Sequence, residues 1–522
     1  IIIFIVKLIK INYFNIMKSI EELVNFYNDD QIFITSEKKT IFTFTDLKKQ
    51  VNLTKIFFEN NNICKNDTIA LVIDNGPDMA SCFLSVASFC CAAPLNPTYT
   101  ISEFNFFLED LKPKALIIKE NYNSQLIDLA LKKGIKVINL FIDNFTSSGH
   151  FFLKLYKQSK INIIKKDFNI IPKDTALILH TSGTTSRPKM VPLTNNNLCN
   201  SAKNIVKTLK LVRSDRCINI MPLFHIHGIV CLLLAPLFSG GSVFASTGFN
   251  ALKFFNWIKD FSPTWYSAVP TMHQAILTRA NRNNETISMS KLRFIRSSSA
   301  PLPSKSMKEM EKIFNCPVIE SYGMTETSHQ MTSNLLPPGI RKALKVGVAA
   351  GPEVAIIDNK NNFLPKGKIG EIIIKGESVT KGYINNPEAN KNSFINDWFR
   401  TGDQGFFDKK NFLQITGRLK EIINKGGEKI MPLEIDDKIM QHESIFQAIT
   451  FPIAHKILGE EIAAAVVLKN NHQLNEEELK KFLSNKIASF KIPQKIIFVD
   501  EIPKGKTGKL KRLGLAKILG LE

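Results

Sequence analysis

Short apolar runs alternate with longer mixed segments through the first half of the chain. Between about residues 68 and 234, the runs 69–73, 115–118 and 176–179 are separated by stretches of mixed polarity. A short apolar run between polar flanks is typical of a buried strand, and a longer mixed segment after it is typical of a helix. This alternation predicts an α/β fold. The polar and basic segment 144–166 is predicted to be a surface connection between subdomains.

A second, smaller unit is predicted after about residue 417. Its strands are expected in three apolar runs: 448–453, 462–468 and 495–499. Asn475 begins a capping-box-like sequence, and the apolar residues that follow it recur at helical spacing. We therefore expect a large body of several subdomains over residues 17–417 and a compact α+β domain over residues 418–522.

The chain of 522 residues has a formal net charge of +21, from 68 Lys and Arg against 47 Asp and Glu. Such an excess occurs in proteins that bind nucleic acid or anionic membranes. Here the lysines are scattered, and no arginine-rich helix, zinc-ligand spacing or RNA-binding motif accompanies them. The charge follows a bias of the whole composition, so no nucleic-acid partner is expected.

The two ends of the chain and its cysteines indicate the cellular compartment in which the protein is expected to work. Residues 1–16 precede the first methionine, Met17, and are apolar but interrupted by Lys7 and Lys10. They lack a basic leader and a cleavage site and are too short to cross a bilayer, so we expect a non-native upstream extension and no membrane insertion. The last three residues are Gly-Leu-Glu, which is not a peroxisomal signal of the Ser-Lys-Leu type. None of the eight cysteines forms a CxxC pair, which favours a reducing, cytoplasmic compartment.

Candidate chemistry begins at residues 180–191, His-Thr-Ser-Gly-Thr-Thr-Ser-Arg-Pro-Lys-Met-Val, directly after the apolar run 175–179. Small hydroxyl residues and a glycine after a buried strand expose backbone N–H groups and short donors that bind phosphate. Lys189 can neutralise phosphate charge. No GxxxxGK[ST] pattern is present, so this is not a Walker loop. A Ser/Thr-rich surface loop would have a similar composition, and the assignment therefore depends on companion motifs.

The segment resembles the phosphate loop of the adenylate-forming enzymes, which include acyl-CoA synthetases, luciferases and peptide-synthetase adenylation domains. The resemblance covers the chain from Met17 onward, and further motif regions follow in the family's order. It implies an AMP-binding function for the larger body. It also implies that six residues of this loop bind ATP: Thr181, Ser182, Gly183, Thr184, Thr185 and Lys189.

The second motif is Glu-Ser-Tyr-Gly-Met-Thr-Glu at residues 320–326. The resemblance assigns four of its residues to the nucleotide: Glu320, Ser321, Tyr322 and Thr325. Tyr322 would stack on adenine, and Thr325 would contact the α-phosphate and act in catalysis. Glu326 would help hold Mg²⁺, because a carboxylate beside a triphosphate is chemically sensible only with a cation between them. Gly323 replaces a common alanine, which we expect to be a mild change.

Two further motifs, at residues 398–403 and 417–421, supply ribose and hinge residues by resemblance. Asp403 matches the residue that accepts hydrogen bonds from both ribose hydroxyls, for which one carboxylate is well suited. Arg418 matches its partner at the ribose and phosphate. Lys420 lies at the position of the family's hinge, where the small domain swivels.

The last two motifs lie in the smaller domain. Gly426 and Gly427, within Asn-Lys-Gly-Gly-Glu-Lys-Ile, resemble the loop that walls the pantetheine tunnel of coenzyme A, where glycine permits a close backbone approach. Residues 502–510 place Lys509 at the family's catalytic lysine. The implied reaction has two steps. An acid first attacks the α-phosphate of ATP beside Lys509; the small domain then rotates about Lys420, withdraws Lys509 and presents the glycine loop for attack by coenzyme A.

The acid substrate is predicted from four segments, which look most like those of oxalate–CoA ligases: 221–228, 264–273, 292–300 and 328–331. A long acyl chain needs an apolar tunnel, whereas a small dicarboxylate needs donors or positive charge for its second carboxylate. His225, Ser299 and His329 are the expected donors, and both histidines are able to carry charge near neutral pH. Oxalate is therefore the favoured acid.

Other functions are left open by the sequence. A medium-chain fatty acid or a coumarate-like arylpropenoate is the next candidate substrate. An amino-acid adenylation domain would need an aspartate within residues 224–227 to bind the amino group, and none is present. A non-catalytic or nucleic-acid-binding relative would lack Lys509 or Glu326, and both are present.

Overall fold

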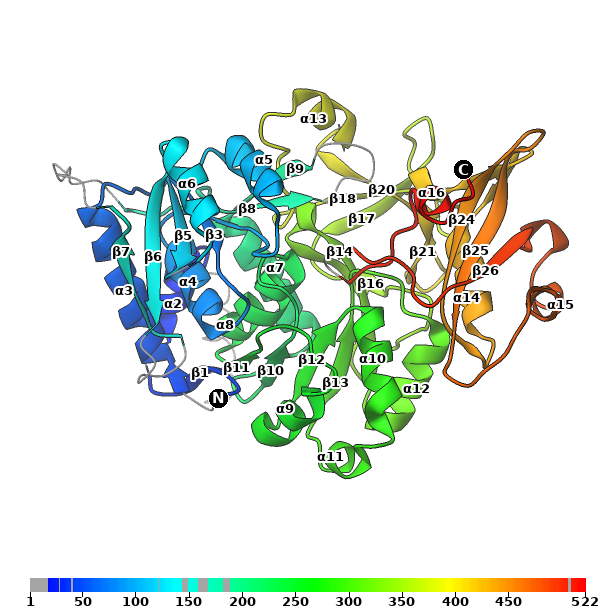
Figure 1. Cartoon of the computed structure of the whole chain (residues 1–522), viewed down its shortest axis with the longest axis horizontal. Coiled ribbons are helices and arrows are strands. Elements are labelled where there is room, and N and C mark those ends of the chain that lie inside the picture. Colours follow the sequence, from blue (N-terminus) through cyan, green and yellow to red (C-terminus); the bar gives the residue numbers. More distant parts are fainter. Residues whose placement is uncertain are drawn as a thin grey trace, which may run out of the picture.

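The computed structural model describes eight stretches of the chain: residues 17–27, 29–38, 41–120, 122–142, 149–157, 168–181, 188–505 and 508–522. The predicted upstream extension, residues 1–16, lies outside the described residues, as do residues 182–187 of the predicted phosphate loop. The fold is the predicted mixed α/β architecture, with a large N-terminal body and a smaller C-terminal sheet at one end of the molecule (Figure 1).

The first sheet of the body has seven strands in the order β7-β6-β5-β3-β4-β8-β9. Their bounds are β3 (Thr68–Val72), β4 (Cys91–Pro94), β5 (Ala115–Lys119), β6 (Lys136–Ile142), β7 (Phe151–Leu155), β8 (Thr175–Thr181) and β9 (Lys189–Thr194). The predicted runs 69–73, 115–118 and 176–179 are confirmed as β3, β5 and β8. Successive side chains of β3 enter two different cores, with Ile69 and Leu71 on one face and Ala70 and Val72 on the other. Burial on both faces explains why these parallel strands are continuous apolar runs.

Strand β7 corrects the predicted surface connection. Its residues lie within the segment 144–166, yet they pair antiparallel with β6 as the edge of the sheet. Phe151 is buried while Phe152 and Lys154 are exposed, so only every second side chain contributes to the core. A half-exposed edge strand lacks the continuous apolar run by which the central strands were identified.

The helices around this sheet begin at side-chain caps. α3 (Phe44–Asn60) and α5 (Ile101–Leu111) start with complete capping boxes at Thr43 and Thr100, respectively. α4 (Pro77–Ala87) begins with proline at its first position, where the missing N–H costs no hydrogen bond. α6 (Ser124–Lys132) follows β5 and leads into β6.

The second sheet of the body has nine strands in the order β16-β15-β14-β13-β12-β10-β11-β1-β2. Their bounds are β1 (Ile32–Thr35), β2 (Ile41–Thr43), β10 (Arg216–Asn219), β11 (Ser242–Ala245), β12 (Trp265–Ala268), β13 (Phe294–Ser297), β14 (Val318–Met324), β15 (His329–Ser333) and β16 (Val348–Ala349). Strands β10 to β14 are parallel. One continuous apolar core includes residues of both sheets, for example Leu177 of β8 and Trp265 of β12, so the two sheets form one body.

Helices cover this sheet and link it to the first. They are α7 (Asn195–Thr208), the π-helix η1 (His227–Leu234), α8 (Ala235–Ser239), α9 (Phe254–Phe261), α10 (Pro270–Ala280) and α12 (Ser304–Phe314). All eight residues of η1 are buried. π-helical turns are rare and often lie at functional sites, and this one begins at His227.

A third, antiparallel sheet leads from the body to the C-terminal sheet. Its strands are β17 (Glu353–Ile357), β18 (Gly370–Lys375), β19 (Phe394–Ile395), β20 (Trp398–Phe407) and β21 (Leu413–Arg418). Strands β20 and β21 pair so that Asp403 lies opposite Arg418. The motifs at residues 398–403 and 417–421, separate in sequence, are therefore neighbours on one ladder.

The C-terminal sheet contains the predicted strands. The runs 448–453, 462–468 and 495–499 are confirmed as β24 (Ile445–His455), β25 (Gly459–Leu468) and β26 (Lys495–Phe498), joined by β22 (Ile423–Lys425) and β23 (Glu428–Ile430). Helices α14 (Pro432–Met440), α15 (Glu476–Ser484) and α16 (Leu515–Ile518) pack on it. Asn475 caps α15 in a capping box with Glu478, as predicted. The apolar residues of this unit form two cores of their own, separate from that of the body.

In the part of the chain that the structure describes, no helix is both long and apolar enough to cross a membrane.

Candidate active site

The predicted site residues follow the carboxyl ends of neighbouring parallel strands. His225 comes after β10, Ser299 after β13, and Thr325 and Glu326 after β14; Thr271, which the sequence did not single out, comes after β12. Strands β14, β13, β12 and β10 are adjacent in the sheet, so their carboxyl ends lie along one edge. Loops at that edge are the usual binding position in parallel α/β sheets.

The phosphate-loop motif begins at the end of β8 and continues into β9. Strands β8 and β9 pair antiparallel, with Thr181 directly opposite Lys189. Four residues predicted to bind ATP lie outside the described residues: Ser182, Gly183, Thr184 and Thr185. Of the rest, Lys189 places its Nζ 4.5 Å from the centre of the Tyr383 ring.

Asp403 joins the nucleotide motifs of β14, β20 and β21. The Tyr322 hydroxyl donates to Oδ2 of Asp403 at 2.5 Å. Nε of Arg418 lies 3.2 Å from Oδ1 of the same carboxylate. Burial raises the pKa of Asp403, while the positive charge of Arg418 opposes this effect. The structure thus brings together the three residues predicted to bind adenosine.

Glu326 lies in the short 3-10 turn that follows β14 and is buried. Its Oε1 accepts a hydrogen bond from the hydroxyl of Tyr383 at 2.9 Å. Burial raises the pKa of Glu326, and that hydrogen bond, Arg418 and Lys189 act in the opposite direction. Tyr383 was not identified from the sequence; its signal is weak because it lies in a segment without a recognised motif.

The other residues of this motif are held by the adjacent strands and loops. The Glu320 carboxyl is buried and accepts from the Leu302 N–H at 3.0 Å, and its burial raises the pKa to about 8. Ser321 donates to the carbonyl of Ser297 at 3.4 Å, and Thr325 is half-buried. A Cβ on Gly323 would lie 1.4 Å from the His329 carbonyl oxygen. The backbone of β15 therefore occupies the space that the side chain of an alanine would need at this position.

Lys509 is carried into this group from the C-terminal domain. In this segment Lys504 pairs antiparallel with Leu510, and the Gly505 N–H donates to the Lys509 carbonyl at 2.7 Å. Thr271, in the first turn of α10, donates its hydroxyl to the Gly508 carbonyl at 2.9 Å. In Figure 1 the red C-terminal segment runs back over the body before it ends at α16.

The charged groups that act on Lys509 belong to the nucleotide motifs. Burial, with a smaller contribution from Arg418, lowers its pKa to about 8, while Asp403 and Glu326 act in the opposite direction. Its charge also acts on His225, His227 and His329.

The predicted acid-binding donors form a compact group with two residues that the sequence did not single out. His227 is buried and bonded on both ring nitrogens, to Ser267 Oγ at 2.7 Å and to Ser299 Oγ at 3.2 Å. The rings of His227 and His329 are stacked with their centres 4.8 Å apart. His225 lies beside them and accepts the His227 N–H on Nδ1 at 3.2 Å. The structure therefore brings His225, Ser299 and His329 together.

Two of these histidines do not carry charge near neutral pH. Burial lowers the pKa of His225 to about 3, with a further contribution from Lys509. Burial also holds the pKa of His329 far below its usual range, and Arg296 adds to the effect. The prediction that both histidines are able to carry charge near neutral pH is wrong, since they are neutral donors or acceptors.

Arg296 supplies the positive charge at this end of the site. Its side chain is 0% exposed, and its guanidinium lies 3.0 Å from His329 Nε2. An arginine within the apolar run Phe-Ile-Arg-Ser of β13 is unusual, because arginine is rarely buried without a partner. A charged residue among the apolar residues of this strand was the signal by which Arg296 could have been identified from the sequence.

The predicted hinge and coenzyme A residues lie in the turns that follow β21 and β22. Lys420 is exposed in the 3-10 turn η3 (Leu419–Glu421) between β21 and β22. Gly426 and Gly427 form the two-residue turn between β22 and β23, with φ of 57° and 94°. Gly426 donates its N–H to the carbonyl of Leu458 at 2.9 Å, within the C-terminal domain.

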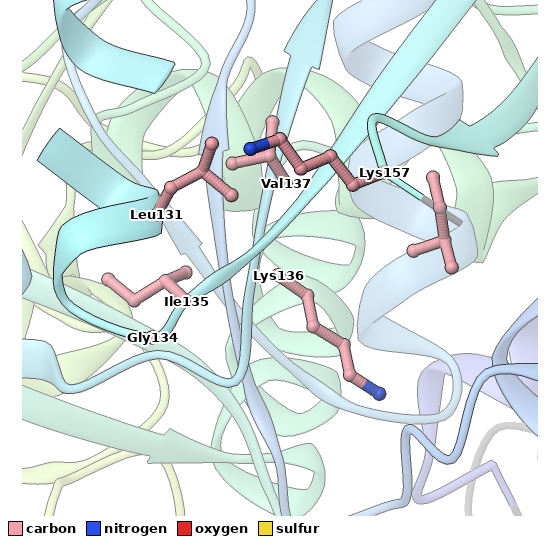
Figure 2. A pocket seen from close by; sticks show the side chains of 7 residues that line it. Leu131, Gly134, Ile135, Lys136, Val137 and Lys157 are labelled. Atoms are coloured by element: carbon pink, nitrogen blue, oxygen red, sulfur yellow. The ribbon is translucent and has the colours of Figure 1, made fainter. Parts of the chain in front are cut away.

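A pocket on the surface of the body has no part in this chemistry. It is lined by Leu131, Gly134, Ile135, Lys136, Val137, Leu155 and Lys157 (Figure 2). These residues lie at the β6–β7 edge of the seven-stranded sheet, opposite the edge formed by β8 and β9. The pocket offers two lysine side chains but no carboxylate or histidine.

Nucleotide motifs and a lysine from a separate C-terminal domain, meeting at one edge of a parallel sheet, define an adenylate-forming enzyme. The chain belongs to the family described as AMP-binding enzyme, whose model matches residues 20–384. A model for the AMP-binding enzyme C-terminal domain matches residues 434–509.

Comparison with individual proteins leads to the same family. The chain is 40% identical to the oxalate–CoA ligase of Saccharomyces cerevisiae over 518 residues, covering 94% of this chain and 95% of the relative. It is also 40% identical to the oxalate–CoA ligase of Arabidopsis thaliana over 450 residues, covering 85% and 87%, respectively. The structure of ATP-bound MatB from Rhodopseudomonas palustris superposes with a TM-score of 0.85 at 26% identity, covering 97% of this chain and 98% of MatB. The protein is an AMP-forming acid–CoA ligase.

Proposed function

We propose that the protein activates oxalate with ATP and transfers the oxalyl group to coenzyme A. The observation that carries this proposal is the buried polar group around Arg296, His227 and His329. A long acyl chain would need apolar walls at this position, whereas a second carboxylate needs donors and positive charge. The two oxalate–CoA ligases that this chain resembles support the same acid.

In the first step a carboxylate of the acid attacks the α-phosphate of ATP, and pyrophosphate leaves. Such transfers ask the protein mainly to align the reactants and to stabilise spreading negative charge. Lys509 is the group proposed to lie between the attacking carboxylate and the α-phosphate, because its charge acts on both the nucleotide motifs and the histidines. Thr325 would contact the same phosphate.

The nucleotide is held by the residues around Asp403. Its carboxylate would accept from the ribose hydroxyls and exchange its bonds to Tyr322 and Arg418 for bonds to the sugar. Tyr322 would then be free to lie against adenine. The phosphates would be bound by the segment that joins β8 to β9, for which Ser182, Gly183, Thr184 and Thr185 stay a prediction.

Glu326 is the residue proposed to hold Mg²⁺. Its carboxylate is buried, its pKa is raised by that burial, and only Oε1 has a side-chain partner among the described residues. A hard divalent cation with oxygen ligands suits this group. When bound, the ion would neutralise phosphate charge beside Lys189 and Arg418.

The second step requires Lys509 to leave the site. We propose a rotation of the C-terminal domain about Lys420, which would withdraw Lys509 and present Gly426 and Gly427 to the pantetheine arm of coenzyme A. The thiolate of coenzyme A would then attack the acyl-adenylate, and AMP would leave. Domain motions of this kind commonly separate two chemical steps at one site.

The test is acid-dependent ATP–pyrophosphate exchange with oxalate, malonate, hexanoate and coumarate. We expect exchange with oxalate to exceed that with hexanoate and coumarate by at least about a hundredfold, because either would bury an apolar chain against unpaired polar groups. Exchange with hexanoate or coumarate but not with oxalate would overturn the proposed acid while leaving the adenylate chemistry intact.

A further inference from the structure

Arg296 holds a positive charge in the interior of the protein without a counter-charge. Nη1 lies 3.0 Å from His329 Nε2 and 3.3 Å from Ser267 Oγ, and Nη2 lies 3.3 Å from Gln330 Oε1. Its Nε has no hydrogen-bond partner among the described residues. In the same part of the chain no carboxylate forms an ion pair with Arg296.

Packing of the sheet gives no reason for an arginine at this position. Arg296 pairs with Ser267 of β12 and Ile319 of β14, between two other strands of a parallel sheet. Its neighbours Phe294 and Ile295 fill the cores on the two faces. An apolar residue would serve such a position at lower cost, because a buried charge without a partner is strongly unfavourable. A ligand of opposite charge is the physical reason that fits.

A metal ion does not fit this group. His227, Cys231 and His329 offer ligand atoms within 4.8 Å of one another, which is close enough for one ion. However, Nε2 of His329 accepts from Arg296, and both nitrogens of His227 are bonded to serine hydroxyls. A dication would also be repelled by the adjacent guanidinium. The charge of the group therefore favours an anion.

The contact with Arg296 also fixes the proton of His329. A guanidinium only donates, so His329 Nε2 must be the acceptor, and the neutral ring carries its proton on Nδ1. No residue in the described ranges accepts a hydrogen bond from that Nδ1. His329 and Ser299 have φ of 100° and 73°, a conformation that non-glycine residues rarely adopt. Such backbone strain gathers where side chains must be held for a ligand.

The two cations that act on the histidines come from different parts of the fold. Lys509 enters from the nucleotide side and Arg296 from within the sheet, and both act on His227 and His329. An acid with one carboxylate at each end would meet a positive charge at both. A monocarboxylate would leave Arg296 without a counter-charge.

We propose that Arg296 determines the choice of acid, because it fixes His329 as an Nδ1–H donor and supplies the charge that the second carboxylate neutralises. This inference rests on the proposed function and deepens it. Since Arg296 acts through His329, it is a positioning residue. Its effect should appear in the binding of the acid and much less in the chemical step.

The experiment compares Arg296→Met and Arg296→Lys with the unchanged enzyme in oxalate-dependent exchange. Loss of a charged hydrogen-bonding partner should raise the KM for oxalate in Arg296→Met by about 10- to 100-fold, with kcat changed by less than about threefold and the KM for ATP unchanged. Arg296→Lys keeps the charge but loses the planar fork, so its KM should lie between the two. If Arg296→Met does not fold, the KM for oxalate of Arg296→Lys provides the test, because it should exceed that of the unchanged enzyme.

Arg293→Gln is the matched control. It removes one positive charge just before the same strand, where Arg293 pairs with Asp215 and is 38% exposed. We expect its KM for oxalate to be unchanged. A KM for oxalate unchanged in Arg296→Met, or a fall in melting temperature with equal losses for ATP and oxalate, would overturn the role of Arg296. Absence of oxalate-dependent exchange in the unchanged enzyme would instead count against the proposed function.

Discussion

Two cations, Lys509 and Arg296, act on the same two histidines, His227 and His329, but their surroundings differ. Lys509 is near the carboxylates of Asp403 and Glu326, which favour its charged form. Arg296 has no such neighbours among the described residues, and it keeps its charge because guanidinium is a much stronger base than ammonium. Only Lys509 can therefore change its charge within the ordinary working range of pH.

This difference predicts the pH dependence of adenylation. Burial lowers the pKa of Lys509 to about 8, so the residue is protonated below that pH and loses its charge above it. The kcat/KM for ATP should be flat below pH 8 and fall with rising pH above it, because the charged form stabilises the transferring phosphate. Rates of pyrophosphate exchange measured at a series of pH values from 6 to about 10 would give the pH dependence of kcat/KM.

Lys509→Arg is the control for this profile. Arginine keeps its charge throughout the same range, so the remaining activity should no longer fall near pH 8. An identical fall in Lys509→Arg would show that another group governs the profile.

At this scale the sequence predicted residue types better than their charge states. The lysine, the carboxylates and the three acid-site donors are all in one group. Neutral His225 and His329 could not be foreseen, because their pKa values are set by burial and by Arg296 and Lys509, which tertiary structure brings near. Arg296 itself was overlooked, although it lies within the segment 292–300, because an arginine inside an apolar strand was not expected to bind the acid.

At the scale of elements, the first turn of α10 is the contact that holds the segment around Lys509. Thr271 donates to the Gly508 carbonyl at 2.9 Å, and a Cβ on Gly508 would lie 3.4 Å from the Val269 side chain. The segment itself is held together by the bond from Gly505 to Lys509. Thr271 therefore contributes to the position of Lys509 without contacting it.

Replacing Thr271 by valine should weaken adenylation selectively. The loss of one partly buried hydrogen bond, about 1 kcal/mol, predicts a rate of pyrophosphate exchange roughly fivefold lower. Thioester formation from supplied acyl-adenylate should be unchanged, because Lys509 is proposed to be withdrawn in that step. Thr278→Val, on an exposed turn of the same helix, should leave both rates unchanged. Equal losses in both half-reactions of Thr271→Val would contradict this role.

The strands were predictable where burial is continuous, as in β3, β5, β8, β24 and β25. Edge strand β7 was not, because only alternate side chains face the core. The π-helix η1 was not predicted either. All its residues are buried, so periodicity gives no signal for its type, and its position is set by packing between α7 and the sheet.

At the scale of the molecule, the C-terminal domain is joined to the body by few polar contacts. Gln447 donates to Gln274 at 3.1 Å, and Ser304 donates to Asp437 at 3.1 Å. Its apolar cores are its own, so its internal packing does not depend on one docked position. A domain held in this way suits the proposed rotation about Lys420.

The measurement that tests the central claim most directly separates the two half-reactions in Lys509→Ala. Pyrophosphate exchange should fall by about 10²–10³, because one preorganised cation at the transferring phosphate is removed. Thioester formation from supplied acyl-adenylate and coenzyme A should stay within about twofold of the unchanged enzyme, since Lys509 is proposed to be withdrawn in that step. Pyrophosphate exchange at the normal rate, or equal loss of both half-reactions, would contradict the claim that the C-terminal domain delivers Lys509 for adenylation alone.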